Sequence, residues 1–245
     1  MKSPSLEGWL AQLCSPATFQ PQVNHLVKKL YQNMLRVVID GQLPREPFKI
    51  PTRMTATHPE CLLRGERIQP QTRAISVNLA RAGTFPSHLC YEALHDYLEP
   101  TLVRQDHIFA SRLTNDEHRV TGTSFGASKI GGDQDAAFVF FPDPMGATGG
   151  TLVSAVEHYK RQVPGKAAAY LALHLIVTPE YLKRVVTAHP DLQIYALRLD
   201  RGLSSEAVLK TPLGQLWDQE RGLNASDYIV PGGGGFGEIM NNSFV

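Results

Sequence analysis

The segment that most limits the possible folds is residues 136–161, where an apolar run passes through a glycine-rich turn into an amphipathic helix. The run is AAFVFF at 136–141, three glycines lie between 146 and 150, and apolar residues then recur at Val153 and Val156. A run that is apolar on both faces is typical of a strand at the buried centre of a parallel sheet. The segment therefore predicts a strand–turn–helix unit inside an α/β domain.

The turn in this unit has the features of an anion-binding site. At the start of a helix the first backbone N–H groups are unpaired, and the positive end of the helix dipole points the same way. Thr148 and Thr151 add hydroxyl donors, while Gly149 and Gly150 let the backbone approach an anion closely. Asp143, just upstream, is placed to bind a sugar hydroxyl or a hydrated metal ion. Together these features predict a site for a phosphate on a sugar. The turn matches neither GxxxxGK[ST] nor GxGxxG, which disfavours a P-loop and a dinucleotide-binding fold.

The rest of the chain alternates between strand-like and helix-like segments. Strands are expected at residues 73–79, 107–110, 168–177 and 192–199, and helices at 86–98, 152–161 and 179–189. Ser87 and Thr178 are the expected N-caps of two of these helices. Alternation of this kind predicts a mostly parallel sheet, flanked by helices and joined by right-handed crossovers.

Four segments fall outside this alternation. Residues 1–45 carry apolar residues at helical spacing and are expected to form an N-terminal helical arm, which leaves 46–245 as the main domain. Residues 45–72 are rich in Pro, Arg and Thr and are interpreted as an irregular connection with one short strand. Residues 111–135 are interpreted as a long functional loop. Residues 203–221 are interpreted as an insertion that forms a short surface helix.

Composition excludes several classes of function. A formal net charge of +1 over 245 residues offers no electrostatic reason for a nucleic-acid or membrane partner. No apolar run is long enough to span a bilayer, and the first 20 residues lack the apolar core of a secretory signal. Cys14, Cys61 and Cys90 are scattered without metal-ligand spacing. We therefore expect a cytoplasmic protein with free thiols and no metal site built from its own side chains.

Five short motifs follow one another between residues 79 and 232. The two strongest are DPMGATGGT at 143–151 and YIVPG at 228–232. The others are LARAG at 79–83, His107-Ile108 followed by Arg112, and Pro179-Glu180 followed by HPD at 189–191 and IY at 194–195. Taken in their order along the chain, these motifs resemble those of the uracil phosphoribosyltransferase family. The family's versions read LRAG, then DPMLATGG followed by Ser or Thr, then YIVPGLGDAGDR.

The resemblance implies a fold and a reaction. The fold is the type I phosphoribosyltransferase α/β fold, with a small hood that carries the base-binding loop. The reaction joins uracil to the ribose of PRPP (5-phosphoribosyl diphosphate) and releases pyrophosphate, which makes UMP in pyrimidine salvage. Mg²⁺ would accompany PRPP, because the diphosphate supplies most of its ligands. Family members typically form homodimers, so the resemblance also implies a second copy of this chain as a partner.

The same resemblance implies roles for individual residues. Asp143 would bind the ribose hydroxyls, and Arg81 would face the pyrophosphate with a planar fork suited to phosphate oxygens. Arg112 would come from an active-site arm, and these three are the expected catalytic residues. The 5′-phosphate of PRPP would be held by Ala147, Thr148, Gly149, Gly150 and Thr151. The base would be bound by Tyr228, Ile229, Gly234 and Glu238.

The chain departs from the family motif in the base-binding loop. Where the family reads GLGDAGDR, residues 232–239 read GGGGFGEI, so the first acid becomes Gly235 and the second becomes Glu238. Gly146 also stands where the family usually has Leu. Two alternatives therefore stay open: a phosphoribosyltransferase for a different base, and a non-catalytic protein that binds PRPP or a nucleotide. Neither the base nor an allosteric nucleotide such as GTP can be predicted from these residues.

Overall fold

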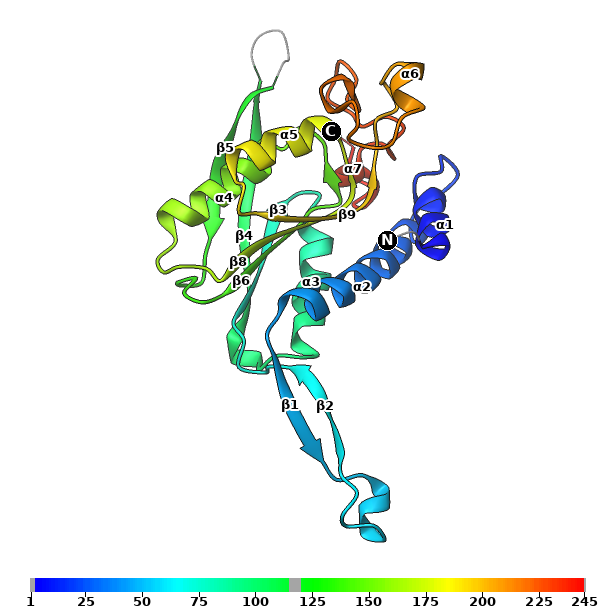
Figure 1. Cartoon of the computed structure of the whole chain (residues 1–245). Coiled ribbons are helices and arrows are strands. Elements are labelled where there is room, and N and C mark those ends of the chain that lie inside the picture. Colours follow the sequence, from blue (N-terminus) through cyan, green and yellow to red (C-terminus); the bar gives the residue numbers. More distant parts are fainter. Residues whose placement is uncertain (1–2, 115–119, 245) are drawn as a thin grey trace.

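The computed structural model describes residues 3–114 and 120–244, with side chains described outside 110–126. Within these residues seven strands form one sheet, in the order β5-β4-β3-β6-β8-β7, with β9 on the other side of β8 (Figure 1). The strands are β3 (Ala74–Ala80), β4 (Val103–Thr114), β5 (Val120–Lys129), β6 (Phe138–Pro142), β7 (Met145–Gly146), β8 (Ala169–Val177) and β9 (Gln193–Leu199). Every pairing is parallel except β4 with β5. The expected mostly parallel α/β sheet is confirmed.

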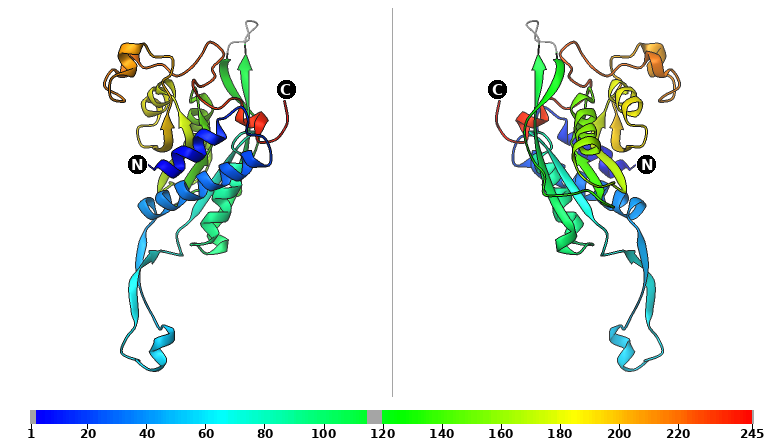
Figure 2. Two further views of the ribbon diagram at one scale, coloured as in Figure 1. Left: turned by 90° about the vertical axis from the view of Figure 1, so that its right-hand side faces the viewer. Right: turned by 90° about the vertical axis from the view of Figure 1, so that its left-hand side faces the viewer.

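Helices cover both faces of this sheet (Figures 1 and 2). On one face lie α2 (Gln22–Gln42) and α3 (Thr84–His95), and on the other lie α4 (Gly150–Gln162) and α5 (Pro179–Ala188). Alternate residues of β6 divide between the two cores, since Phe140 packs with the first pair of helices and Val139 and Phe141 with the second. A strand that is buried on both sides needs apolar residues throughout, which explains the apolar residues from Phe138 to Phe141. Ala136, at the start of the AAFVFF run, lies exposed in the turn before the strand.

The N-terminal residues form two helices, α1 (Pro4–Leu13) and α2, which pack on the domain. Nine side chains of α2 are buried, and the Tyr31 hydroxyl donates a hydrogen bond to the Leu173 carbonyl at 3.1 Å. Leu10 and Leu13 of α1 belong to the same core cluster. The helical content expected for residues 1–45 is present, and α2 is part of the main hydrophobic core.

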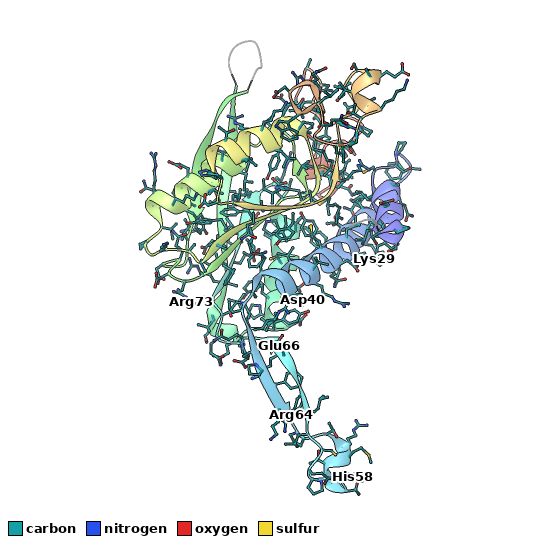
Figure 3. All side chains as sticks on the ribbon, viewed as in Figure 1. Lys29, Asp40, His58, Arg64, Glu66 and Arg73 are labelled. Atoms are coloured by element: carbon teal, nitrogen blue, oxygen red, sulfur yellow. The ribbon has the colours of Figure 1, made fainter. Side chains whose placement is uncertain are left out.

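Residues 45–72 form a two-stranded antiparallel hairpin, so the prediction of an irregular connection with one short strand was wrong. Its strands are β1 (Arg45–Ile50) and β2 (Leu63–Ile68), with η1 (Arg53–Ala56) between them. The hairpin projects away from the domain, and its labelled side chains Arg64, Glu66 and His58 follow it outward (Figure 3). Most of its residues are exposed, so the strands show no alternation of apolar and polar residues for sequence reasoning to detect.

Residues 111–135 were predicted to be a long loop, and this too was wrong. β4 continues to Thr114 and pairs with β5 in an antiparallel ladder with two register shifts. Backbone hydrogen bonds hold such a ladder whatever the side chains are, so a polar, Ser- and Thr-rich sequence can still form it.

Of the two predicted helix N-caps, one is confirmed and the other is wrong. Thr178 is the N-cap of α5, because its side chain accepts a hydrogen bond from the Tyr181 amide at 3.0 Å, as predicted. The N-cap of α3 is Gly83, however, and Ser87 lies inside the helix with its hydroxyl bonded to the Thr84 carbonyl. None of the helices formed by residues 3–114 and 120–244 is both long and apolar enough to cross a bilayer.

The 203–221 segment contains two one-turn elements where we expected a single short helix. They are α6 (Glu206–Leu209) and η3 (Trp217–Gln219). The Arg201 guanidinium donates to the buried Glu220 carboxylate at 2.7 Å, which ties the start of the segment to its end. The chain closes with the short helix α7 (Phe236–Ile239), and η2 (Pro100–Leu102) precedes β4.

Candidate active site

A cavity of about 450 Å³ lies where the ends of β3 and β6, the start of α4 and the C-terminal loop meet. The parallel strands β3 and β6 end at the same edge of the sheet, which brings the segments after them together. Most of the residues predicted to bind PRPP and the base line this one cavity: Arg81, Asp143, Ala147, Thr151, Tyr228, Ile229, Gly234 and Glu238. Segments that are about 150 residues apart in the sequence thus face each other.

The predicted phosphate turn occupies one end of this site. Thr148 and Gly149 line a small adjoining cavity of about 60 Å³, and Gly150 is the first residue of α4. Gly149 has a φ of 78°, which disfavours any side chain, and a Cβ there would lie 2.8 Å from Val185 Cγ2. The cavity therefore lies beside the start of α4, where the first backbone amides of a helix are available to an anion.

A buried hydrogen-bonded pair lies behind the phosphate turn. His174 Nδ1 is 2.6 Å from the Asp143 carbonyl oxygen, to which it donates, and Nε2 is 2.5 Å from the Tyr181 hydroxyl, from which it accepts. Burial lowers the pKa of His174 to about 4, so the ring is neutral at physiological pH. Burial also raises the pKa of Tyr181, so its hydroxyl stays protonated and can donate. The pair therefore holds the backbone beside the Asp143 carboxylate.

Gly146 makes room for Tyr181 in this arrangement. A Cβ at position 146 would lie 2.8 Å from Val177 Cγ1 and 3.0 Å from the Tyr181 ring. Such contacts are too close for a larger side chain without displacement of the tyrosine. The departure from Leu at this position is thus matched by the packing of Tyr181 against the turn.

The two arginines predicted to be catalytic differ in how much of them the structure describes. Arg81 follows β3 at the cavity wall, and its Nη1 donates to the Ser243 carbonyl at 3.1 Å, so the C-terminal residues lie beside it. The peptide bond before Arg81 is cis. Arg112 is a residue of β4, but its side chain lies outside the described part of the structure.

The base loop is tied to the end of β9 by a charged pair. Arg198 donates from Nε and Nη2 to the two carboxylate oxygens of Asp200, at 2.6 and 2.8 Å. The same carboxylate accepts from the Gly232 amide at 2.8 Å, and Arg198 also donates to the Gly232 carbonyl at 3.3 Å. These bonds hold both backbone groups of Gly232, whose φ is 56°. The first glycine of the run is therefore fixed in place.

The approach to the base loop is held by acceptor side chains. Glu180, in the first turn of α5, accepts hydrogen bonds from the Gly222 and Leu223 amides. Asn224 Oδ1 accepts from the amides of Ser226 and Tyr228, at 3.0 and 2.9 Å. These bonds present Tyr228 and Ile229 at the cavity wall.

Several residues of the site were missed by sequence reasoning. Met145 and Asp227 line the main cavity, as does Phe236 of the divergent loop at 232–239. Arg184 of α5 lies over the start of α4, where a Cβ on Gly150 would be 3.3 Å from its Nη1. Met145 and Asp227 each had a signal that could have been used, because Met145 lies inside the motif at 143–151 and Asp227 directly precedes the predicted base-binding Tyr228. Arg184 comes from another helix, and nothing in the sequence places it beside the turn.

Comparisons with known proteins agree with this architecture. Residues 1–219 match the family model described as uracil phosphoribosyltransferase. The chain is 38% identical over 91 residues to the uracil phosphoribosyltransferase of Latilactobacillus sakei subsp. sakei (strain 23K), and 36% identical over 91 residues to that of Streptococcus mutans serotype c. Each match covers 37% of this chain and 42% of the relative, so it spans about two fifths of those proteins.

The fold has a solved counterpart. The structure of the AQ2163 protein from Aquifex aeolicus superposes with a TM-score of 0.71 at 19% identity, covering 98% of this chain and 95% of that one. At this identity the similarity concerns the fold alone. The family model, in contrast, matches most of the chain, including the phosphate turn and the segment around Arg81. The chain therefore belongs to the uracil phosphoribosyltransferase family.

Proposed function

We propose that this protein transfers the phosphoribosyl group of PRPP to uracil, giving UMP and pyrophosphate. The observation that carries the proposal is the single cavity that joins a phosphate turn at the start of α4 to a base loop at the chain's C-terminal end. A sugar phosphate held at the first end and a planar base at the second would meet at the anomeric carbon. Family membership supports the same reaction class.

In this proposal each part of the cavity has one task. The turn from Ala147 to Thr151 binds the 5′-phosphate, and Asp143 accepts hydrogen bonds from the ribose hydroxyls. Arg81 and Arg112 neutralise the leaving pyrophosphate, which is the charge that grows as the C1′–O bond breaks. Backbone groups of Ile229 and Gly234 bind the polar edge of the base beside the Tyr228 ring. Positioning of two bound reactants is the main source of rate in such a site.

Magnesium would enter this site together with PRPP. Among residues 3–114 and 120–244, no group of three or more His, Cys, Asp or Glu side chains converges in a way that could hold a metal ion. Mg²⁺ retains several water molecules and binds readily to substrate phosphates, so a site with few protein ligands suits it. When bound, the ion would neutralise the diphosphate. Asp143, which lines both cavities, is the carboxylate at the phosphate end that could contact the hydrated ion.

The divergent sequence of the base loop supports a second candidate function. The protein would then either use a base other than uracil or bind PRPP without catalysis. The family match ends at residue 219, and the run GGGGFGE at 232–238 lies beyond it. The phosphate end of the site is thus supported by the family match, while the base end is supported by the geometry and the YIVPG motif at 228–232. Any difference in activity from other family members should therefore appear in the specificity for the nucleobase.

Pyrophosphate release separates these candidates. The protein is incubated with PRPP and Mg²⁺ and with uracil, cytosine, thymine, hypoxanthine or no base, and pyrophosphate is measured. We expect uracil-dependent release. Release with another base alone would replace uracil as the substrate. No release with any base, together with a melting temperature raised by PRPP, would favour the binding-protein alternative; ligand at 100 times its Kd stabilises by about 2.7 kcal/mol, which a melting curve resolves.

We also propose that the protein is a homodimer that works in the cytoplasm. The β1–β2 hairpin supports the dimer, because it projects from the domain with Ile50, Met54 and Leu63 exposed (Figure 2). A two-stranded hairpin is only marginally stable by itself, and it gains stability by packing on another surface. The three free cysteines support a reducing compartment.

A further inference from the structure

The residue that carries this inference is Glu238, whose carboxylate lies directly over the glycine at position 235. A Cβ built on Gly235 would overlap Glu238 Oε2 and would lie 3.2 Å from its Cδ. The space beside the backbone of residue 235 is therefore already filled, by a side chain that comes from three residues further along. A glycine at 235 is what allows Glu238 to take this position.

The short helix α7 brings Glu238 back to this place. The amides of Glu238 and Ile239 both donate to the Gly235 carbonyl at 3.0 Å. This turn brings Glu238 back over Gly235. α7 is also anchored to the body of the protein. Phe236 is buried in the main core, and Gln20 Nε2 donates to the carbonyl oxygens of Ile239 and Met240, at 3.2 and 2.9 Å. Glu238 thus projects from a fixed support, although four glycines precede it.

The Glu238 carboxylate faces the cavity without a partner from the protein. Glu238 lines the same cavity as Gly234, Ile229 and Tyr228, which form its base end. In the part of the chain that the structure describes, no hydrogen bond or ion pair to this carboxylate is formed. By contrast, the carboxylates of Asp200 and Glu180 are occupied by backbone amides. Glu238 is therefore an acceptor available to a ligand.

We propose that Glu238 accepts the ring N–H proton of the nucleobase during phosphoribosyl transfer, an inference that rests on the proposed function. A nucleobase such as uracil carries a hydrogen on the nitrogen that becomes glycosidic. As that nitrogen bonds to C1′, its N–H bond breaks, the proton passes to the Glu238 carboxylate, and the N–H electron pair forms the new N–C bond. The C1′–O bond breaks and its electron pair leaves with pyrophosphate. Glu238 is then a catalytic residue that also selects bases with an N–H at this position.

Asp227 is the rival carboxylate at this end of the cavity. It lines the cavity and, among the described residues, also forms no side-chain hydrogen bond or ion pair. Asp227, however, lies in the turn between Asn224 and Tyr228, with a φ of 61°, before the base-binding backbone begins. Glu238 overlies residue 235, directly beside Gly234, so we assign the role to Glu238.

The test compares E238Q, E238A and D227N with the wild type in steady-state pyrophosphate release. Gln keeps the shape of Glu but cannot take up a proton at neutral pH, so we expect E238Q to lower kcat with uracil by about 100-fold, within the usual range for loss of a general base. KM for PRPP and the melting shift caused by PRPP should stay unchanged, because the phosphate turn is untouched. E206Q is the matched control: Glu206 is exposed and pairs only with Lys210 on the surface.

A positional rescue gives a readout that a structural role would not produce. In the double variant G235D/E238A the space above residue 235 is empty, so the introduced aspartate can supply the missing carboxylate. We expect this variant to be at least tenfold faster than E238A. G235D alone should gain nothing over the wild type, because its Cβ would displace Glu238.

Four results would overturn the assignment. Equal turnover by E238Q and the wild type would reject the role of Glu238 but not the proposed function. A loss of turnover in D227N alone would have the same meaning. A G235D variant that is faster than the wild type would show that Glu238 does not replace an acid at 235. No turnover of any base by the wild type would reject the proposed function and this role together.

Discussion

At the scale of single residues, His174 shows how burial and function are joined in this site. Its ring is almost fully buried, is held by the Asp143 carbonyl and the Tyr181 hydroxyl, and lines the small cavity behind the phosphate turn. The folded state keeps the ring neutral, with a pKa of about 4 against an ordinary value of 6.5. Protonation must therefore oppose folding, since the charged ring is better solvated in the unfolded chain.

This gives a prediction about stability and pH. Because the folded pKa is lowered, the contribution of His174 is complete above pH 6.5 and is lost as pH falls towards about 4. A shift of this size corresponds to about 3 kcal/mol of unfolding free energy. Urea unfolding at pH 7 and pH 4.5 should show a smaller loss of stability on acidification in H174Q than in the wild type. Equal losses in the two proteins would mean that His174 is not the group that resists protonation.

At the scale of elements, the end of β9 controls the base loop. Arg198 and Asp200 lie two residues apart on the same side of the strand end, and together they hold Gly232 by both of its backbone groups. Asp200 is buried, so loss of its arginine would leave a charge without its main partner. The order of the glycine run thus depends on a pair that is remote from it in the sequence.

We predict that R198M weakens base binding more than PRPP binding. Arg198 is about one third exposed, so the cost should fall below that of a fully buried pair, at about 2 kcal/mol of unfolding free energy. KM for uracil should rise at least tenfold while the PRPP-induced melting shift persists. The control is K210M, which breaks an exposed pair with Glu206 and should change stability by less than about 0.5 kcal/mol. Equal effects on uracil and PRPP would argue against a role confined to the base loop.

At the scale of the whole molecule, the β1–β2 hairpin is the proposed contact between two copies of this chain. Ile50 and Leu63 are opposite each other across β1 and β2, and both are about half exposed. We predict that I50T/L63T converts a dimer into a monomer, because Thr keeps the strand preference but removes apolar surface from the proposed contact. Light scattering after size-exclusion chromatography measures this directly. V186T, at an exposed site on α5, should remain dimeric. A monomeric wild type would contradict the dimer itself.

Much of the buried half of the molecule was predictable from local signals. The FVFF part of the predicted strand, the glycine turn and the Thr178 N-cap are each encoded within a few neighbouring residues and appear where they were expected, although the strand begins at Phe138, two residues later than predicted. The β1–β2 hairpin and the pairing of β4 with β5 were not predictable, because backbone hydrogen bonds hold both pairs of strands and place few demands on side chains.

The sequence by itself determined the α/β class and the position of the glycine turn before α4, because strand burial and helix starts are written in local patterns of apolar residues, glycines and caps. About half of the residues that line the cavity were also expected, those of the C-terminal loop from the motif resemblance alone. Only the tertiary structure decided how the site closes. Tyr181 in the space left by Gly146 and Asp200 bonded to Gly232 are contacts between separate elements, and the position of Glu238 over Gly235 depends on the anchoring of α7 by Gln20 and the core. Their meaning depends on which atoms the fold brings within a few ångströms, and spacing along the chain does not reveal that.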